Sequence, residues 1–251
     1  MDRGAHYYKT DFQVHTPRDI NWMGTGARTP AERQQYASEF VAECRKRGLQ
    51  AVAITDHHDL ALLPFIKAAA EGETDGSGQP VAPEQRLIVF PGMELTLGVP
   101  CQAIMLLDAD FPVTLLASVP QLLGVDQRDQ AEPKHAPIKR LEHIRSFEDL
   151  YTKLNEQPHL RGRFIVLPNV SEGGNTTLLR AGFATHYKGM PCVGGYLDGL
   201  VAQLGEGNQS IVGGRNKEWG NKPVGLFQTS DNRKRTFEDL GCGSRKLDAS
   251  S

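Results

Sequence analysis

Continuous apolar runs, separated by stretches with helix signals, constrain the fold of this chain more than any other sequence feature. The runs lie at 49–55, 86–95, 101–108, 163–168 and 223–231. Strands that are apolar at nearly every position, and not only at alternate positions, are typical of sheets buried on both faces. The sequence therefore predicts an α/β fold built on a parallel sheet or barrel.

The helix signals between these runs are strongest in the segment 29–48. Thr29 is expected to be the N-cap, Pro30 to occupy the first helical position, and Glu32 to complete a capping box. Ser146 predicts a similar helix start. Further helices are expected at 60–72, 176–187 and near 198–204.

The length fits one large domain or two small ones, and the composition is that of a soluble globular protein. We expect one domain, 1–251, with 108–145 as an insertion or irregular connection. The formal net charge of −2 does not indicate general binding of nucleic acid. No apolar run approaches the ~18–20 residues needed to span a bilayer, and the N-terminus lacks a signal-peptide core. The scattered cysteines (Cys44, Cys101, Cys192 and Cys242) suit a reducing compartment, so we expect a cytoplasmic protein without membrane contact.

Polar side chains gather where the expected strands end. They are Gln13, His15, Asp56, His57, His58, Asp59, Glu94, Gln102, Asn169 and Asp231. The carboxyl ends of the strands carry the functional site in α/β sheets and barrels. One such end is unremarkable, but polar side chains at successive ends predict a metal or substrate site at this edge.

Four short motifs, "DFQVHT", "AITDHHD", "FPGMEL" and "TSD", resemble the successive motifs of the PHP (polymerase and histidinol phosphatase) family. The resemblance runs from about residue 10 to 233, with the motifs in the family's order and spacing. It implies a distorted (β/α)7 barrel that holds up to three divalent metals and hydrolyses phosphoesters. The chain is also similar to PHP domains at the N-terminus of large AAA- or SMC-like ATPases, which implies a longer chain, an ATPase partner domain and a role in DNA repair or defence.

The resemblance assigns metal-ligand roles to His15, His57, Glu94 and Asp231, and a role in orienting or assisting the site to Asp56. Other family histidines are replaced here, by Gln13, Gln102, Asn169 and Arg233, while Asn21 is a further candidate in the first loop. His58, one residue beyond its motif position, is an additional candidate for the catalytic set.

These replacements predict a reduced metal centre. An amide oxygen binds hard cations but replaces imidazole poorly on zinc. We therefore expect at most one tightly bound ion, Mn²⁺ or Mg²⁺ more readily than Zn²⁺, on His15, Glu94 and Asp231 with Gln13 at the margin. A site without metal remains an alternative. Gln102 and Asn169 are expected to line the pocket.

Two functions remain open at this point. In the first, the domain is a phosphoesterase or nuclease-like enzyme in which Asp56 or His58 accepts a proton and Arg233 steadies developing charge. In the second, a degenerate barrel binds nucleotide, nucleic acid or a partner domain without hydrolysis. The basic segment Arg233, Lys234 and Arg235 is either a nucleic-acid contact or a solvated loop, and a homo-oligomer is compatible with both.

Overall fold

The computed structural model describes residues 8–125 and 138–241, so Cys242 and part of the expected insertion 108–145 lie outside the described residues. The strands are β1 (Thr10–Val14), β2 (Ala51–Ile54), β3 (Ile88–Thr96), β4 (Gln102–Leu107), β5 (Phe164–Pro168), β6 (Gly194–Asp198) and β7 (Gly225–Thr229). The α-helices are α1 (Pro30–Lys46), α2 (Leu63–Glu71), α3 (Ser118–Leu122), α4 (Phe147–Asn155), α5 (Ala184–Gly189) and α6 (Glu206–Val212). Single 3₁₀ turns lie at Pro83–Gln85, Val113–Leu115, Val201–Gln203 and Lys217–Trp219.

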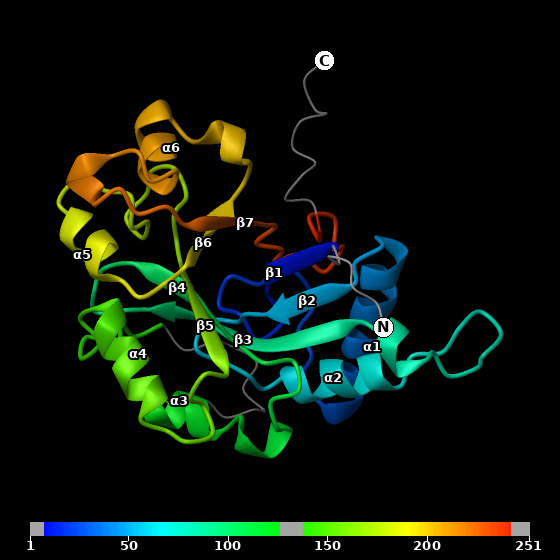
Figure 1. The fold of residues 1–251 in the computed structure, drawn as a ribbon. Coiled ribbons are helices and arrows are strands. Elements are labelled where there is room, and N and C mark those ends of the chain that lie inside the picture. The colour runs from blue at the N-terminus through cyan, green and yellow to red at the C-terminus, as the bar shows by residue number, and fades with distance from the viewer. Residues whose placement is uncertain (1–7, 126–137, 242–251) are drawn as a thin grey trace, which may run out of the picture.

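The strands form two sheets, and the fold is α/β as predicted (Figure 1). One sheet has the order β1-β2-β3-β4-β5, and the other pairs β6 with β7 in parallel. The expectation of an all-parallel sheet is wrong at β4, which runs antiparallel to both β3 and β5. The short segment 97–101 explains this, because a parallel neighbour needs a crossover of about a dozen residues or more.

All seven strands contribute to one small apolar interior. Its members are Phe12, Ala53, Phe90, Ile104, Leu106, Leu167, Tyr196 and Phe227. The two sheets adjoin through single backbone contacts, from Val170 N to Tyr196 O at 2.9 Å and from His15 N to Asn232 O at 3.0 Å. The strands therefore surround a shared interior, but the hydrogen-bonded ladder is interrupted at both junctions, so the strands do not form a closed barrel.

A glycine permits the close approach at the first junction. A Cβ atom built on Gly195 would lie 2.8 Å from Val170 Cγ1 and 3.0 Å from the Pro168 carbonyl oxygen. Any larger residue would push β6 away from β5.

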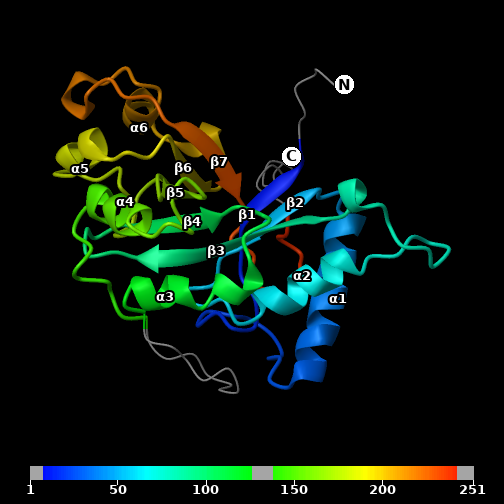
Figure 2. The ribbon, with the colours of Figure 1, turned by 60° about the horizontal axis from the view of Figure 1, so that its bottom comes forward.

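Helices cover the outside of the strands (Figure 2). Helix α1 has the predicted start, since the Thr29 side chain accepts from Glu32 N at 3.2 Å and the Glu32 carboxylate accepts from Thr29 N at 2.9 Å. Its buried stripe includes Tyr36 and Phe40, which pack into the main apolar core. Helix α4 likewise begins after Ser146, whose hydroxyl accepts from Asp149 N.

Two helix predictions need correction. The segment 176–187 is helical only from Ala184, because its first residues bond to other elements: Thr176 O accepts from Gln102 N, and Leu178 N donates to Asn169 O. The helix expected near 198–204 is a single 3₁₀ turn, and α6 begins at Glu206. Cys44, Cys101 and Cys192 are buried free thiols. Within the described residues, no helix is long and apolar enough to cross a membrane.

Candidate functional site

The ends of the first strands bring His15, His57 and Glu94 together. Strands β1, β2 and β3 run parallel, so their carboxyl ends share one edge, where His57 and Glu94 also form a backbone bridge. Gln102 reaches the same edge for the opposite reason. It begins β4, and the start of an antiparallel strand lies beside the end of its neighbour.

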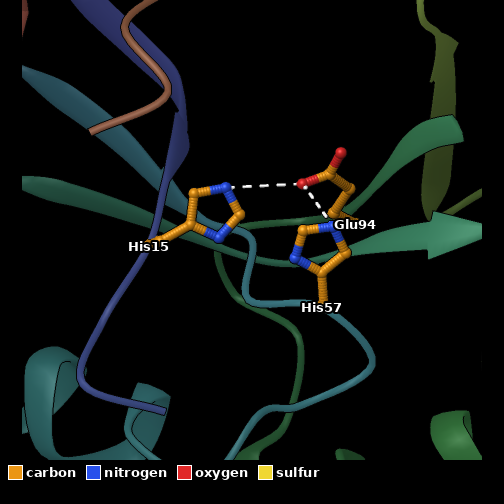
Figure 3. A group of neighbouring side chains, drawn as sticks. All are labelled: His15, His57 and Glu94. Carbon is orange, nitrogen blue, oxygen red and sulfur yellow. Dashed lines mark ion pairs between the residues drawn. The ribbon is translucent and has the colours of Figure 1, made fainter. Parts of the chain in front are cut away.

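Glu94 Oε2 is the shared atom of this group. It lies 3.4 Å from His15 Nε2 and 3.2 Å from His57 Nε2 (Figure 3). The two imidazole rings stack with centroids 5.4 Å apart and an interplanar angle of 17°. All three side chains are almost fully buried, and their ligand atoms are close enough to hold one metal ion.

Two further side chains complete the arrangement around Glu94. The Tyr196 hydroxyl donates to Glu94 Oε1 at 3.2 Å, which leaves Oε2 facing the histidines. Asp231, just beyond β7, places Oδ1 3.0 Å from His15 Nε2. The backbone of Asp231 is left-handed, with φ of 49°. Such a conformation costs a non-glycine residue about 1 kcal/mol or more and is commonest at functional sites.

The donor spacing fits a metal ion. Ligands at about 2.1 Å from an ion stand about 3.0 Å apart in octahedral and about 3.4 Å apart in tetrahedral geometry. The separations of His15 Nε2 from Asp231 Oδ1 and Glu94 Oε2, 3.0 and 3.4 Å, fall at these values. Both ring nitrogens of the fully buried His15 also lack a well-directed hydrogen bond, despite their close carboxylate neighbours. A buried imidazole in this state is suited to coordination.

Asp19 is a central residue of the site that sequence reasoning missed. Its Oδ2 lies 2.9 Å from His15 Nδ1 and 2.8 Å from His57 Nδ1, and its side chain is fully buried. A carboxylate behind each histidine orients the ring and increases its basicity. The sequence prediction named Asn21 in this loop. The available signal was an acid four residues after the strand-end histidine, in "HTPRD".

Arg233 lies among the carboxylates of the site. Its Nη1 is 2.6 Å from Asp19 Oδ1, and its Nη2 is 2.8 Å from Asp231 Oδ1 and 3.4 Å from Glu94 Oε2. The Arg233 side chain is 13% exposed and that of Asp231 33%, whereas Asp19 and Glu94 are buried. Solvent therefore reaches the site past Asp231 and Arg233.

The carboxylates decide the protonation of His15. Burial by itself lowers the pKa of His15, but the close carboxylates of Asp19 and Asp231 outweigh burial and raise this pKa to about 10. Burial raises the pKa of Asp19, but its hydrogen bonds to His15 and His57 produce a net lowering. The pKa of Asp231 is lowered by His15 and Arg233 against the opposing effect of burial. Without metal, the site is a network of paired charges.

Asp56 lies behind His15 and outside the Glu94 group. Its Oδ1 accepts from Thr16 N at 2.7 Å, and its Oδ2 accepts from the Thr16 hydroxyl at 2.6 Å. Oδ1 is 3.9 Å from His15 Nδ1. Burial, with repulsion from Asp19, raises the pKa of Asp56 to about 7. In this position Asp56 can help to orient His15, but Asp56 itself is shielded from solvent.

Hydrogen bonds within the protein already occupy atoms of His58 and Gln13. His58 Nε2 accepts a hydrogen bond from Thr96 N at 3.0 Å, so a proton acceptor at this nitrogen requires that bond to break. Gln13 donates from Nε2 to Asp231 Oδ1 at 3.2 Å, while its Oε1 accepts from the Thr229 hydroxyl at 2.7 Å. The Gln13 oxygen needed for metal ligation is therefore turned away from the site.

The two amides expected to line the pocket differ in position. Gln102 Nε2 lies 3.2 Å from His57 Nε2, beside the group. Asn169 is buried at the end of β5, and its Oδ1 accepts from Ser171 N at 2.8 Å. Its side-chain oxygen therefore stabilises the turn after β5.

Lys234 and Arg235, the other two basic residues of this segment, are neutralised locally. Lys234 Nζ pairs with Glu238 and lies 3.1 Å from Asp239 Oδ2. Arg235 pairs with Glu39 on α1, and its guanidinium lies 5.1 Å from the centroid of the Tyr36 ring. These two side chains stabilise the protein's own surface.

Known proteins resemble this chain in structure alone. The sequence matches no protein-family profile, and no curated protein matches it. Endonuclease Q, crystallised with a 27-mer duplex bearing an abasic lesion at its active site, aligns at a TM-score of 0.52 and 10% identity over 90% of this chain. Endonuclease Q from Pyrococcus furiosus, a lesion-specific endonuclease, gives the same TM-score, identity and coverage.

The Endonuclease Q chains are longer than the present chain, so the likeness extends over only part of them. The chain spans about half the length of the Endonuclease Q chains, 49% and 48%. A candidate metal-dependent phosphoesterase from Bifidobacterium adolescentis aligns at a TM-score of 0.46 and 14% identity, covering 89% of this chain and 87% of that one. This last value is too low to support an inference about the present chain. The Endonuclease Q alignments show that the chain shares its fold with part of a nuclease.

Proposed function

We propose that this chain is a PHP-type domain that binds one hard divalent metal ion and hydrolyses phosphoester bonds. The observation that carries the proposal is the group of His15, His57 and Glu94 with Asp231, at separations suited to coordination. The distorted barrel, the family membership and the reduction to a single ion are parts of this proposal. The fold likeness to Endonuclease Q supports it.

The residues of the candidate site have distinct proposed roles. His15, His57, Glu94 and Asp231 would hold the ion. We place Mn²⁺ or Mg²⁺ above Zn²⁺ because amides and an arginine replace the other imidazoles of the family pattern. An ion there would polarise the phosphoester and lower the pKa of a coordinated water. Asp19, together with Asp56, would orient the histidines, which makes them positioning residues. Arg233, partly open to solvent, would contact a phosphate oxygen.

We propose a nucleic-acid phosphodiester as the substrate. Endonuclease Q was crystallised with a DNA duplex, and the guanidinium of Arg233, whose side chain is 13% exposed, matches phosphate geometry. Association with an ATPase domain of a longer chain, and a role in DNA repair or defence, remain proposals that rest on the sequence resemblance.

The position of Arg233 favours a second candidate function. A guanidinium among Asp19, Glu94 and Asp231 supplies positive charge that a metal would otherwise provide. A metal-free, non-hydrolytic domain could use the same arginine to bind a nucleotide or nucleic-acid phosphate. This is the degenerate-barrel alternative.

Metal content and hydrolysis separate the two functions. The purified chain is loaded with Mn²⁺, desalted and analysed for bound metal, then assayed on bis(p-nitrophenyl) phosphate and on labelled DNA. We expect about one ion per chain and hydrolysis that EDTA abolishes. Asp231→Ala should remove both, while Asp239→Ala, a surface acid near the same segment, should change neither. No retained metal and no hydrolysis, with nucleotide or DNA binding preserved in Asp231→Ala, would establish the degenerate alternative.

A further inference from the structure

Arg233 contacts the same oxygen atoms that the candidate metal ligands present. Its Nη2 lies 2.8 Å from Asp231 Oδ1 and 3.4 Å from Glu94 Oε2. Those two oxygens are also the ones nearest His15 Nε2, at 3.0 and 3.4 Å. The guanidinium and a metal ion would therefore draw on the same negative charge.

The arginine is firmly held in this position. Nη1 lies 2.6 Å from Asp19 Oδ1, and Nε donates to Asp231 Oδ2 at 3.2 Å. Two of its three nitrogens, Nη1 and Nε, thus contact carboxylates of the site other than Glu94. Loss of the Nη2 contacts alone would leave the side chain attached through Nη1 to Asp19.

Building on the proposed function, we propose that Arg233 is an internal competitor for the metal. Its guanidinium stabilises the carboxylates when metal is absent, weakens metal binding, and limits the site to a single ion. The site then loads only when divalent metal is abundant, and the arginine contacts released on loading become available to a phosphate oxygen. Arg233 in this sense sets the affinity of the site and the number of ions that it binds.

The charge of the site supports competition. Asp19, Glu94 and Asp231 supply three carboxylates within contact of one guanidinium. A divalent ion placed close to a fixed positive charge is repelled, and burial reduces the screening of that repulsion. Removing the guanidinium leaves the carboxylates and histidines intact, with more net negative charge for a cation.

The test measures metal affinity by isothermal titration calorimetry with Mn²⁺, independently of activity. Arg233→Gln should tighten Mn²⁺ binding by about tenfold or more and increase the number of ions bound per chain. Arg233→Lys keeps the charge and should stay close to the wild-type affinity. Lys234→Gln removes an equal charge from the next residue, where the side chain pairs with Glu238, and should leave affinity unchanged.

Thermal unfolding provides a second measurement of metal binding that is independent of the calorimetric titration. In EDTA, Arg233→Gln should lower the melting temperature, because it removes a positive charge that neutralises three carboxylates. Mn²⁺ should raise the melting temperature of Arg233→Gln more than that of the wild type.

The outcomes distinguish this inference from the proposed function. Equal Mn²⁺ affinity and stoichiometry in wild type and Arg233→Gln would overturn the competitor role while leaving a metal-dependent function in place. Binding by Arg233→Gln alone would support the competitor role and contradict metal use by the wild type. Binding by neither protein would overturn both.

Discussion

Tyr196 donates a hydrogen bond from its hydroxyl to Glu94 Oε1 across 3.2 Å, and this bond fixes which oxygen of Glu94 faces the two histidines. Both residues are buried. The phenol comes from β6 and the carboxylate from β3, so the bond joins the two sheets at the site.

Tyr196→Phe should weaken Mn²⁺ binding by about tenfold, because hydrogen-bond partners behind a ligand typically contribute 10–100-fold to affinity. Stability should fall by about 1–2 kcal/mol, since Glu94 Oε1 loses its donor. Calorimetric titration and urea unfolding measure the two effects. Tyr187→Phe is the matched control: Tyr187 OH donates to backbone oxygens of Ile211 and Lys222 away from the site. Equal metal affinity in wild type and Tyr196→Phe would deny the positioning role.

Asp19→Asn should destabilise the metal-free protein by about 3 kcal/mol or more, because it removes the buried carboxylate that both His15 and Arg233 contact. Urea unfolding in EDTA gives this value. The same change should weaken Mn²⁺ binding, since both histidines lose the carboxylate that orients them. Asp59→Asn, which breaks the buried pair with Arg18, should cost stability without altering metal affinity. A variant with wild-type stability and affinity would remove Asp19 from the site.

The contrast between Asp19 and Thr29 shows what the sequence can predict. Thr29, Pro30 and Glu32 carry their information locally, so the start of α1 was predicted correctly. Asp19 acts through His57 on another strand, and its role depends on the path of the loop after β1. The spacing of Asp19 from the strand-end His15 is a local signal, but the contact with His57 is not encoded locally.

The other differences between the sequence predictions and the structure arise from the topology of the sheet. The polar residue at Gln102 was identified, but its position at this edge depends on β4 running antiparallel after a short connection. The segment from Thr176 has helical composition, yet Gln102 and Asn169 use its backbone groups. The gaps between β5 and β6 and between β7 and β1 arise from tertiary packing. Motif order alone does not encode such packing.

The stability of the metal-free protein should fall as pH rises through the alkaline range. The pKa of His15 is raised from 6.5 to about 10 in the fold, so its contribution is complete below about 6.5 and is lost as pH rises through about 10. The pKa of Asp56 is raised to about 7, so ionisation of this buried carboxyl also costs stability as pH rises toward 7. In urea unfolding with EDTA, the free energy of unfolding should decline between pH 5 and 10 by the order of a few kcal/mol. His15→Gln should abolish the part of this decline that lies above about pH 6.5. Stability that increases from pH 6.5 to 10 would contradict this assignment.

Metal affinity should change in the opposite direction. Coordination by His15 requires its proton to leave, so Mn²⁺ should bind more tightly as pH rises from 6 to 8.5. Calorimetry in buffers of different ionisation enthalpy would report the released proton. Binding without proton release would place the ion away from His15.

DNA binding, if present, should depend on Arg233 and not on the rest of the basic segment. With Mn²⁺ bound, which releases Arg233 contacts in the proposed site, Arg233→Ala should flatten the dependence of log affinity on log salt by roughly one unit, as expected for one lost phosphate contact. Lys234→Ala should leave affinity and slope unchanged, because this side chain already pairs with Glu238 and Asp239. Fluorescence anisotropy with a labelled duplex measures both quantities. A smaller slope in Lys234→Ala would show that the surface pair opens to bind DNA.

Gln13→His should shift the metal preference toward Zn²⁺. The Gln13 amide nitrogen lies 3.2 Å from Asp231 Oδ1, so an imidazole at this position would stand beside a candidate ligand. Imidazole is a better ligand for zinc than an amide is. Competition titrations with Zn²⁺ and Mn²⁺ should show a larger zinc-to-manganese affinity ratio than in the wild type.

Gln13→Glu is the matched control for that change, because it adds an oxygen ligand at the same position. It should favour Mn²⁺, since carboxylate oxygen suits hard cations. Thr229 now donates to the Gln13 oxygen at 2.7 Å, and a glutamate would keep this acceptor. If both variants changed the two affinities equally, position 13 would influence the ion only through Asp231. Wild-type protein that retained two or three zinc ions per chain would instead show that the amide does not reduce the metal centre.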